Sequence, residues 1–253
     1  MDEKEKDQSI LTNLGSFRVC HISDTHNRHK RVVIPECDIL ICSGDISGMG
    51  NKGEVEDFLK WFMRQTQATC KVLVAGNHDI SFDAMKFPEK HKPEWLCELL
   101  DSYDDYGLSD TNFYLENEMK NVMGVNIWGS PYSSWFHGET WGFNVRRGND
   151  SHELYSTIPL GAGIIITHGP PFGKNDWCND INGPVGCEDL RKHIKRVKPL
   201  LCLSGHIHES YGYSFDQDTH YFNGAICNLN YEPVNAPWLI EANFDEKEVT
   251  ILN

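Results

Sequence analysis

Short runs of apolar residues recur along the chain, and each run ends abruptly at Gly, Asp, Asn or His or just before one of them. The six clearest runs are rich in β-branched residues and nearly continuous, and they occupy residues 17–22, 39–42, 72–75, 125–128, 164–167 and 200–203. This pattern is typical of strands that are covered on both faces of a sheet. We therefore expect six buried strands at these positions.

Between the runs lie segments whose apolar residues follow a helical period. The clearest apolar stripe comprises Val55, Phe58, Leu59, Phe62 and Met63, which would line one face of a helix. Further helices are predicted over residues 93–100, where Pro93 suits the first turn, and over 190–197, which Pro199 would close. With a strand-rich end over 211–252, this alternation predicts a mixed α/β sandwich, and no boundary divides residues 1–253 into two domains.

Composition and charge narrow the class of partner. Acidic residues outnumber basic ones by 37 to 23, which gives a net charge of −14, while 40% of the residues are hydrophobic. Such a chain is an ordinary globular protein that repels a polynucleotide backbone. A small anionic substrate remains possible if the site itself supplies positive charge.

The chain shows no sign of export or of a membrane segment. Residues 1–10 lack the apolar run of a signal peptide, and no stretch is apolar enough to span a bilayer. The nine cysteines form no CxxC pair, so neither a zinc ribbon nor a disulfide framework is indicated. We expect a reduced, cytoplasmic setting.

Candidate ligand residues follow directly after five of the apolar runs, where Asp, Asn and His occur with almost no cationic residue. Ligand sites in α/β sheets form outside the carboxyl ends of the strands. Carboxylate, carboxamide and imidazole without thiolate favour divalent Mn, Fe or Zn. The seven candidate ligands are Asp24, His26, Asp45, Asn77, His168, His206 and His208.

Seven ligands exceed what one tetrahedral ion needs. If one carboxylate bridges, they divide into two sets of four, which predicts a two-metal hydrolytic site. Two dications against Asp24 and Asp45 would leave a locally positive pocket that attracts phosphate. His206 and His208, two residues apart, would face the same side of an extended chain.

In order along the chain, these residues form the pattern DxH…GD…GNHD…H…GHxH between Asp24 and His208. The pattern resembles the signature of the calcineurin-like metallophosphoesterases. Further segments resemble the metallophosphoesterase-domain-containing branch of that family, namely residues 141–148, 166–171, 185–187, 223–225 and 233–237. The resemblance implies one domain over residues 1–253 with a four-layer αββα sandwich, in which helices flank two mixed β-sheets.

The resemblance also implies a division of the ligands. Asp24, His26, Asp45 and His208 would hold one metal ion, and Asp45, Asn77, His168 and His206 the other, with Asp45 bridging. The neighbouring His78 would bind no metal but would protonate or stabilise the leaving oxygen. Mn is the ion we expect, with Fe or Zn as alternatives.

The activity implied is hydrolysis of small-molecule phosphodiesters, cyclic nucleotides being the favoured class, by in-line attack of a hydroxide held between the two metals. Two alternatives stay open: a nucleotide-binding sensor with little turnover, and a broad phosphomonoesterase. A protein Ser/Thr phosphatase is disfavoured because Ile-Ser-Gly follows Asp45 in place of that group's extension.

Simpler interpretations explain less of the pattern. The aspartates could cap helices, but capping leaves the five histidines at the strand ends unexplained. Residues 48–53 read GxGxxG, yet no acidic residue ends the following strand, as a dinucleotide site would require. The chain contains no GxSxG, which excludes a serine α/β-hydrolase.

The segment 131–163 is long, polar and rich in aromatic residues. Its aromatic side chains could simply pack against one another. Alternatively, the segment could form a wall over the metals, in which Trp141 stacks on a base and Arg146 or Arg147 holds a phosphate. Both interpretations remain open from the sequence.

Overall fold

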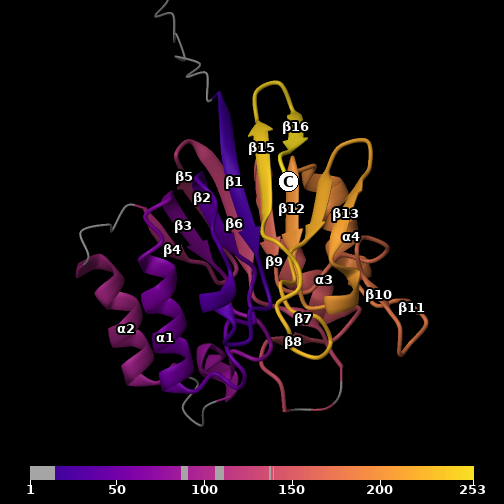
Figure 1. The fold of residues 1–253 in the computed structure, drawn as a ribbon. Coiled ribbons are helices and arrows are strands. Elements are labelled where there is room, and N and C mark those ends of the chain that lie inside the picture. Colours follow the sequence, from indigo (N-terminus) through magenta and orange to yellow (C-terminus); the bar gives the residue numbers. More distant parts are fainter. Residues whose placement is uncertain (1–14, 87–90, 106–110, 137, 139) are drawn as a thin grey trace, which may run out of the picture.

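Two six-stranded β-sheets face each other and are flanked by helices on both outer sides (Figure 1). This computed structural model describes residues 15–86, 91–105, 111–136, 138 and 140–253. Residues 1–10, which the sequence analysis expects to carry no signal segment, lie outside this range. The predicted α/β sandwich with two mixed sheets is confirmed.

The first sheet joins the beginning and the end of the chain. Its strands β1 to β4 are parallel, whereas β15 pairs antiparallel with both β1 and β16. In spatial order the strands are β16 (Glu248–Ile251), β15 (Trp238–Asn243), β1 (Ser16–Ile22), β2 (Cys37–Cys42), β3 (Ala68–Leu73) and β4 (Asn112–Tyr114).

The second sheet is built from the later part of the chain. Its four inner strands are parallel, and each outer strand is antiparallel to its neighbour. The spatial order is β13 (Gly212–Phe215), β14 (His220–Asn223), β12 (Leu201–Ser204), β9 (Ile164–Thr167), β6 (Val125–Ser130) and β5 (Glu118–Val122).

Three hydrophobic clusters hold the four layers together. The central cluster lies between the sheets and joins Val19 and Ile39 of the first sheet to Ile127 and Ile164 of the second. Of the two outer clusters, one packs α1 (Lys52–Met63) and α2 (Glu94–Asp105) on the first sheet and the other packs α3 (Asn149–Ser156) and α4 (Glu188–Val197) on the second. The strands are therefore buried on both faces, as their continuous apolar runs predict.

The sequence predicts most of these elements but not all of them. Helix α3 is missing from the prediction because its buried face consists of little more than Ser151 and Tyr155. It belongs to the aromatic segment 131–163, which also contains the short strands β7 (Ser133–Ser134) and β8 (Asn144–Val145). The remaining short elements are η1 (His29–Arg31), η2 (Ile80–Phe82), η3 (Ala84–Lys86), η4 (His208–Ser210), β10 (Trp177–Cys178) and β11 (Gly183–Pro184).

The parallel strands of both sheets run in one direction and end at the lower edge in Figure 1. Because both sheets present their carboxyl ends there, loops from distant parts of the sequence meet at this edge. No helix in the described part of the chain is long and apolar enough to span a bilayer.

Candidate metal centre

The loops that follow β1, β2, β3, β9 and β12 bring the predicted ligands together at this edge. The potential ligands form three overlapping groups, and within each group the ligand atoms all lie within 4.8 Å of one another. The groups are Asp24, His26 and His208; His26, Asp45 and His78; and Asp45, His168 and His206. Residues 182 positions apart, such as His26 and His208, are thus direct neighbours.

The first group corresponds to one predicted metal site. The Nε2 atom of His208 lies 3.3 Å from Oδ1 of Asp24 and 3.1 Å from Nε2 of His26. The same Asp24 oxygen lies 3.9 Å from Nε2 of His26. All three ligand atoms therefore face a common point.

The other predicted site gathers around His168, which is fully buried. Its Nε2 lies 3.3 Å from Oδ2 of Asp45 and 2.9 Å from Oδ1 of Asn77. His206 completes this group, with its ring centroid 5.0 Å from that of His168.

Asp45 lies between the two groups. Its Oδ2 atom is 3.8 Å from Nε2 of His26 on one side and 3.3 Å from Nε2 of His168 on the other. Its Oδ1 atom accepts a hydrogen bond of 2.8 Å from the backbone N–H of His78. The carboxylate is thus held in place at one oxygen and open to both groups at the other.

The second ring nitrogen of three of these histidines faces a backbone carbonyl. The contacts are His26 Nδ1 to Ser47 O at 3.2 Å, His168 Nδ1 to Ser43 O at 2.9 Å, and His208 Nδ1 to Asn228 O at 3.0 Å. An Nδ1–H that donates to a carbonyl leaves a lone pair on Nε2, the arrangement found around metal-bound histidines. The Nε2 atoms of His26 and His208 lie 3.1 Å apart, so their two lone pairs need a cation or a proton between them.

The buried carboxylates Asp24 and Asp45 favour positive charge at two separate points, His208 and His168. Burial lowers the pKa of His208, but its hydrogen bond to Asp24 and the charge of Asp24 outweigh this and raise the pKa to about 9. Burial also lowers the pKa of His168, but the charge of Asp45 and its hydrogen bond to His168 outweigh this effect and raise the pKa to about 9. Burial, together with the charge of His168, lowers the pKa of His206 to about 3. Buried carboxylate and imidazole groups with this demand for charge fit divalent cations.

The backbone of the site is unusual. Asp24, His26, Asp45 and His206 have positive φ angles of 51°, 39°, 52° and 68°. Such conformations are uncommon for residues other than glycine and tend to gather at functional sites. The prediction of an extended chain at His206 and His208 is wrong, because His206 is left-handed and η4 begins at His208. Both side chains still reach the metal centre, in different ligand groups.

Glycines beside the ligands permit close approach. A Cβ atom on Gly76 would lie 2.2 Å from Oδ1 of Asp45, and one on Gly205 would lie 2.1 Å from Oδ2 of Asp24. Both distances are far below van der Waals contact. These two motif glycines therefore allow the aspartates to reach their positions.

Asp79 is a supporting residue that the sequence analysis did not assign, although it is the last residue of the GNHD motif. Its buried carboxylate accepts hydrogen bonds from the backbone N–H groups of Ile46, Ser47 and Gly76 and from the Ser47 hydroxyl. It thereby ties the loop that carries Asp45 to the loop that carries Asn77. Its signal in the sequence was the motif itself.

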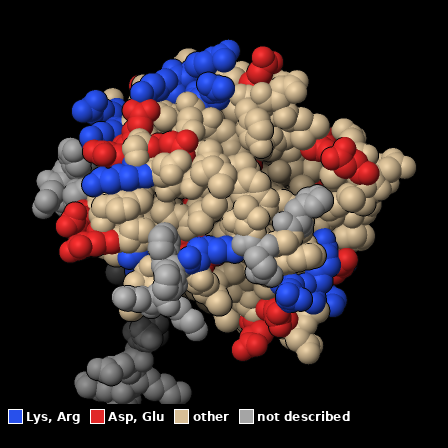
Figure 2. Space-filling view, turned by 90° about the horizontal axis from the view of Figure 1, so that it is seen from below, with Lys and Arg blue, Asp and Glu red and all other residues tan. Residues whose placement is uncertain are grey.

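A cavity of about 300 Å³ opens onto the cluster, and its wall is partly aromatic. It is lined by Asp45, Asn77, His78, Phe136, Trp141, His206, His208, Leu229 and Tyr231. Figure 2 shows this end of the molecule, where Lys, Arg, Asp and Glu gather mainly around the rim and the middle is occupied mostly by other residues. The cavity thus combines candidate metal ligands with a wall of aromatic and aliphatic side chains.

The aromatic segment divides between the two roles that the sequence leaves open. Phe143 is buried and packs against Tyr132, with ring centroids 5.5 Å apart. Phe136 and Trp141 instead cover the site, and the Trp141 ring lies 4.2 Å from the His78 ring.

The two arginines of this segment do not line the cavity. Arg147 pairs with Glu188 and also donates to the backbone carbonyls of Val185 and Gly186. The Arg146 guanidinium lies 5.8 Å from the Trp135 ring. Their placement favours a structural role, and their predicted contact with substrate stays untested.

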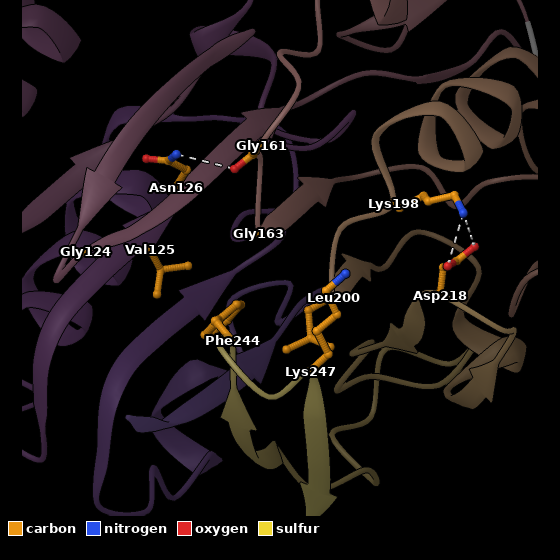
Figure 3. A pocket seen from close by; sticks show the side chains of 10 residues that line it. All are labelled: Gly124, Val125, Asn126, Gly161, Gly163, Lys198, Leu200, Asp218, Phe244 and Lys247. Carbon is orange, nitrogen blue, oxygen red and sulfur yellow. Dashed lines mark hydrogen bonds and ion pairs between the residues drawn. The ribbon is translucent and has the colours of Figure 1, made fainter. Parts of the chain in front are cut away.

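A second cavity of about 280 Å³ lies at the opposite end of the second sheet (Figure 3). Its polar side chains are Asn126, Lys198, Asp218 and Lys247, and Lys198 pairs with Asp218 at 3.1 Å. No group of potential metal ligands occurs at this end among the described residues.

Comparison with known proteins agrees with this geometry. The sequence profile of the "Calcineurin-like phosphoesterase" family matches residues 17–210. The chain is 38% identical to "Metallophosphoesterase domain-containing protein 1" of Homo sapiens and of Mus musculus over 242 residues, which cover 90% of this chain and 71% of the relative. It is 31% identical to a "UPF0046 protein" of Caenorhabditis elegans, over 84% of this chain and 70% of that one.

One solved crystal structure shares the fold, with a TM-score of 0.62 at 13% identity over 92% of this chain and 97% of the other. The family comprises hydrolases of phosphoesters that typically bind two divalent metals, in agreement with the ligand clusters at the carboxyl edge. Both the profile and the 38% identity over 90% of the chain therefore place this chain in the calcineurin-like phosphoesterase family.

Proposed function

We propose that this chain binds two divalent metal ions, preferably Mn, and hydrolyses small phosphodiesters, with cyclic nucleotides as the favoured substrates. One observation carries the proposal: Oδ2 of Asp45 lies within 3.8 Å of both His26 and His168, between two groups of ligands. When bound, a pair of dications would supply the positive charge that activates water and screens the phosphate oxygens. The reduced cytoplasm is the compartment we propose, in accord with nine cysteines that are all free thiols.

The proposed ligand sets keep the division that the family resemblance implies. Asp24, His26 and His208 would hold one ion together with Asp45, and Asn77, His168 and His206 would hold the other with the same carboxylate. The backbone carbonyls of Ser43, Ser47 and Asn228 orient three of the imidazoles for this task.

His78 is the group we propose to assist the leaving oxygen. Its Nδ1 lies 2.7 Å from the carbonyl oxygen of Gly48, to which Nδ1–H can donate, and Trp141 covers its ring. The ring also borders the cavity in front of the cluster. A histidine that is oriented in this way and open to the cavity can give a proton to a departing alkoxide.

The cavity favours a small substrate with a planar apolar part. Trp141 and Tyr231 stand at its mouth, and rings of this kind stack on nucleobases. The net charge of −14 speaks against a polynucleotide. Trp141 is therefore the proposed base-stacking residue.

The proposal is tested with Mn-loaded protein and a panel of 3′,5′-cyclic nucleotides, bis-aryl phosphates and phosphomonoesters. We expect turnover of the diesters with kcat/KM above that of the monoesters. Equal or higher kcat/KM for monoesters would favour the broad phosphomonoesterase. Tight nucleotide binding without turnover would favour the sensor.

A further inference from the structure

Arg28 borders a third cavity, which adjoins the one in front of the metal cluster. This cavity measures about 320 Å³ and is lined by His26, Arg28, Gly48, Met49, His78, Trp141 and Tyr231. Three of these residues, His78, Trp141 and Tyr231, also line the first cavity. The two cavities are therefore neighbouring compartments of one opening, and Arg28 is the one Lys or Arg among the described residues that line them.

The contacts of Arg28 leave most of its guanidinium available. Its Nε donates a hydrogen bond of 3.3 Å to the carbonyl oxygen of Tyr231. Within the described part of the chain, its two terminal nitrogens have no hydrogen-bond acceptor and it has no carboxylate at ion-pair distance. A guanidinium held at Nε and open at both terminal nitrogens presents a fork of donors that matches two oxygens of an anion.

The loop that anchors Arg28 is itself fixed to the metal centre. The carbonyl oxygen of Asn228 faces Nδ1 of His208 at 3.0 Å, while the Asn228 side chain accepts from the backbone N–H groups of Asn230 and Glu232. The Tyr231 ring meets the ring of His26 edge-on, with centroids 4.7 Å apart. Arg28 therefore stands at a defined place relative to the ligands rather than on an independent surface loop.

We infer that Arg28 forms a subsite for a second anionic group on the substrate, so that the preferred substrates are small phosphodiesters that carry a further phosphate on their organic arm. The inference rests on the proposed function, since it takes the scissile phosphate to bind at the metal cluster. The second phosphate would then extend past His78 and Tyr231 into the compartment of Arg28.

Charge favours an anion over a neutral acceptor at this position. The carboxylate of Glu54, in the first turn of α1, is engaged by the backbone N–H groups of Gly48, Met49 and Asn51 and by the Asn27 side chain. Among the described residues, Arg28 is therefore a cation without an ion-pair partner, in a chain with a net charge of −14. Charge-assisted bidentate hydrogen bonds are stronger than those to neutral acceptors.

The test compares two substrates that differ only in the second phosphate: adenosine 2′,3′-cyclic phosphate with and without a 5′-phosphate. The proteins are the Mn-loaded wild type, Arg28→Gln, Arg28→Lys and Lys30→Gln. Lys30 is a matched control because its exposed side chain pairs with Asp57 and lines neither cavity. Calorimetric binding of adenosine 3′,5′-bisphosphate against adenosine 3′-phosphate to the same proteins gives a second measurement that needs no turnover.

We expect the wild type to prefer the 5′-phosphorylated substrate in kcat/KM, and the bisphosphate in affinity, by roughly 10- to 100-fold. Arg28→Gln should abolish both preferences, because it should lower kcat/KM for the 5′-phosphorylated substrate far more than for the unphosphorylated one. Arg28→Lys should retain part of them, because a point charge remains without the fork. Lys30→Gln should keep both preferences.

A wild type without either preference, or an Arg28→Gln variant that weakens both members of each pair equally, would overturn the inference. An equal loss would mean that Arg28 acts on the base or on the phosphate at the metals. If no substrate is hydrolysed, the proposed function fails, but the ratio of the two binding constants in Arg28→Gln still decides the role of Arg28.

Discussion

The two ends of the sandwich offer cavities of similar size with very different chemistry. The cavity at the carboxyl edge measures about 300 Å³ and opens onto Asp45, His206 and His208, whereas the one at the opposite end measures about 280 Å³ and has Lys198 paired with Asp218. Volume therefore does not distinguish the functional end. The arrangement of donor atoms does.

The difference follows from strand direction. Strands leave the sheets at the carboxyl edge from a buried core, so the next few residues are rigidly placed and partly buried. Asp24 and Asp45 are 0% and 2% exposed, and desolvated carboxylates there need cationic partners. At the other end, Lys198 and Asp218 keep their water, and their pairing demands nothing further.

The largest expected effect comes from Asp45→Asn, which removes the charge shared by both ligand groups. We expect loss of at least one bound metal per chain and a fall in kcat of at least about 10²–10³-fold, as for other preorganised charges in active sites. Asp218→Asn makes the same chemical change at the opposite end and should leave activity and metal content unaltered. An active Asp45→Asn protein with two tightly bound ions would refute the bridging role.

His78→Ala should act in proportion to the basicity of the leaving group. An alkoxide from a ribose ring needs a proton, so hydrolysis of 3′,5′-cyclic nucleotides should fall by about 10²–10⁴-fold. Nitrophenolate departs with little help, so nitrophenyl phosphodiesters should be affected far less. Metal analysis serves as the control, since equal losses on both substrates together with a lost metal would make His78 a ligand.

Gly76→Ala should weaken metal binding although it adds only one methyl group. The new Cβ would lie 2.2 Å from Oδ1 of Asp45, so the carboxylate must move. We expect a loss of about 10–100-fold in metal affinity, the range for displaced supporting groups. Gly53→Ala is the matched control because its Cβ would meet no atom within 4 Å, and its metal affinity should equal that of the wild type.

Metal binding should release protons, because the same nitrogens bind both. His168 and His208 have pKa values of about 9, so both are protonated in metal-free protein at pH 7. Metal affinity should therefore rise with pH up to about 9. Calorimetry in buffers of different ionisation enthalpy should count about two protons released at pH 7, and a value of zero would show that neither histidine is a ligand.

The same two histidines set a stability trend for metal-free protein. Their folded pKa values lie above the unfolded value of about 6.5, so their stabilisation is complete below pH 6.5 and is lost as the pH rises to about 9. The melting temperature of protein treated with a chelator should fall across this range. Metal-loaded protein, whose histidines are already deprotonated, should show a flatter profile.

The smallest effect is expected at the opposite end. Lys198 closes helix α4 with a φ of 55°, a conformation that glycine adopts without strain. Lys198→Gly should change the free energy of unfolding by no more than about 1 kcal/mol, since it relieves strain but removes an exposed ion pair with Asp218. Its kcat should match that of the wild type, and a drop would show that the two ends are coupled.

The sequence predicts the sandwich and its ligands because both depend on local patterns. Buried parallel strands appear in the sequence as continuous apolar runs. The residues that follow them lie at the carboxyl edge of the sheet, whatever the order of the strands. The left-handed backbone of His206 could not be predicted, because it depends on packing that includes Gly205 against Asp24. Arg28 and Tyr231 were missed since only tertiary structure brings residues 203 positions apart together.

The arginines near Trp141 show the reverse case. Arg146 and Arg147 lie close in sequence to an aromatic residue at the site, but the chain turns into α3, and Arg147 is used to fix Val185 and Gly186. Closeness in sequence to a site residue therefore does not by itself place a side chain in the cavity, and the predicted contact of these arginines with substrate stays a prediction.

The central claim is a dinuclear centre bridged by Asp45, and electron paramagnetic resonance of the Mn-loaded protein tests it most directly. Two Mn ions that share a carboxylate are magnetically coupled, so we expect a coupled spectrum at two Mn per chain in the wild type. In Asp45→Asn we expect the coupling to disappear. A spectrum of one isolated Mn per chain in the wild type would contradict the account.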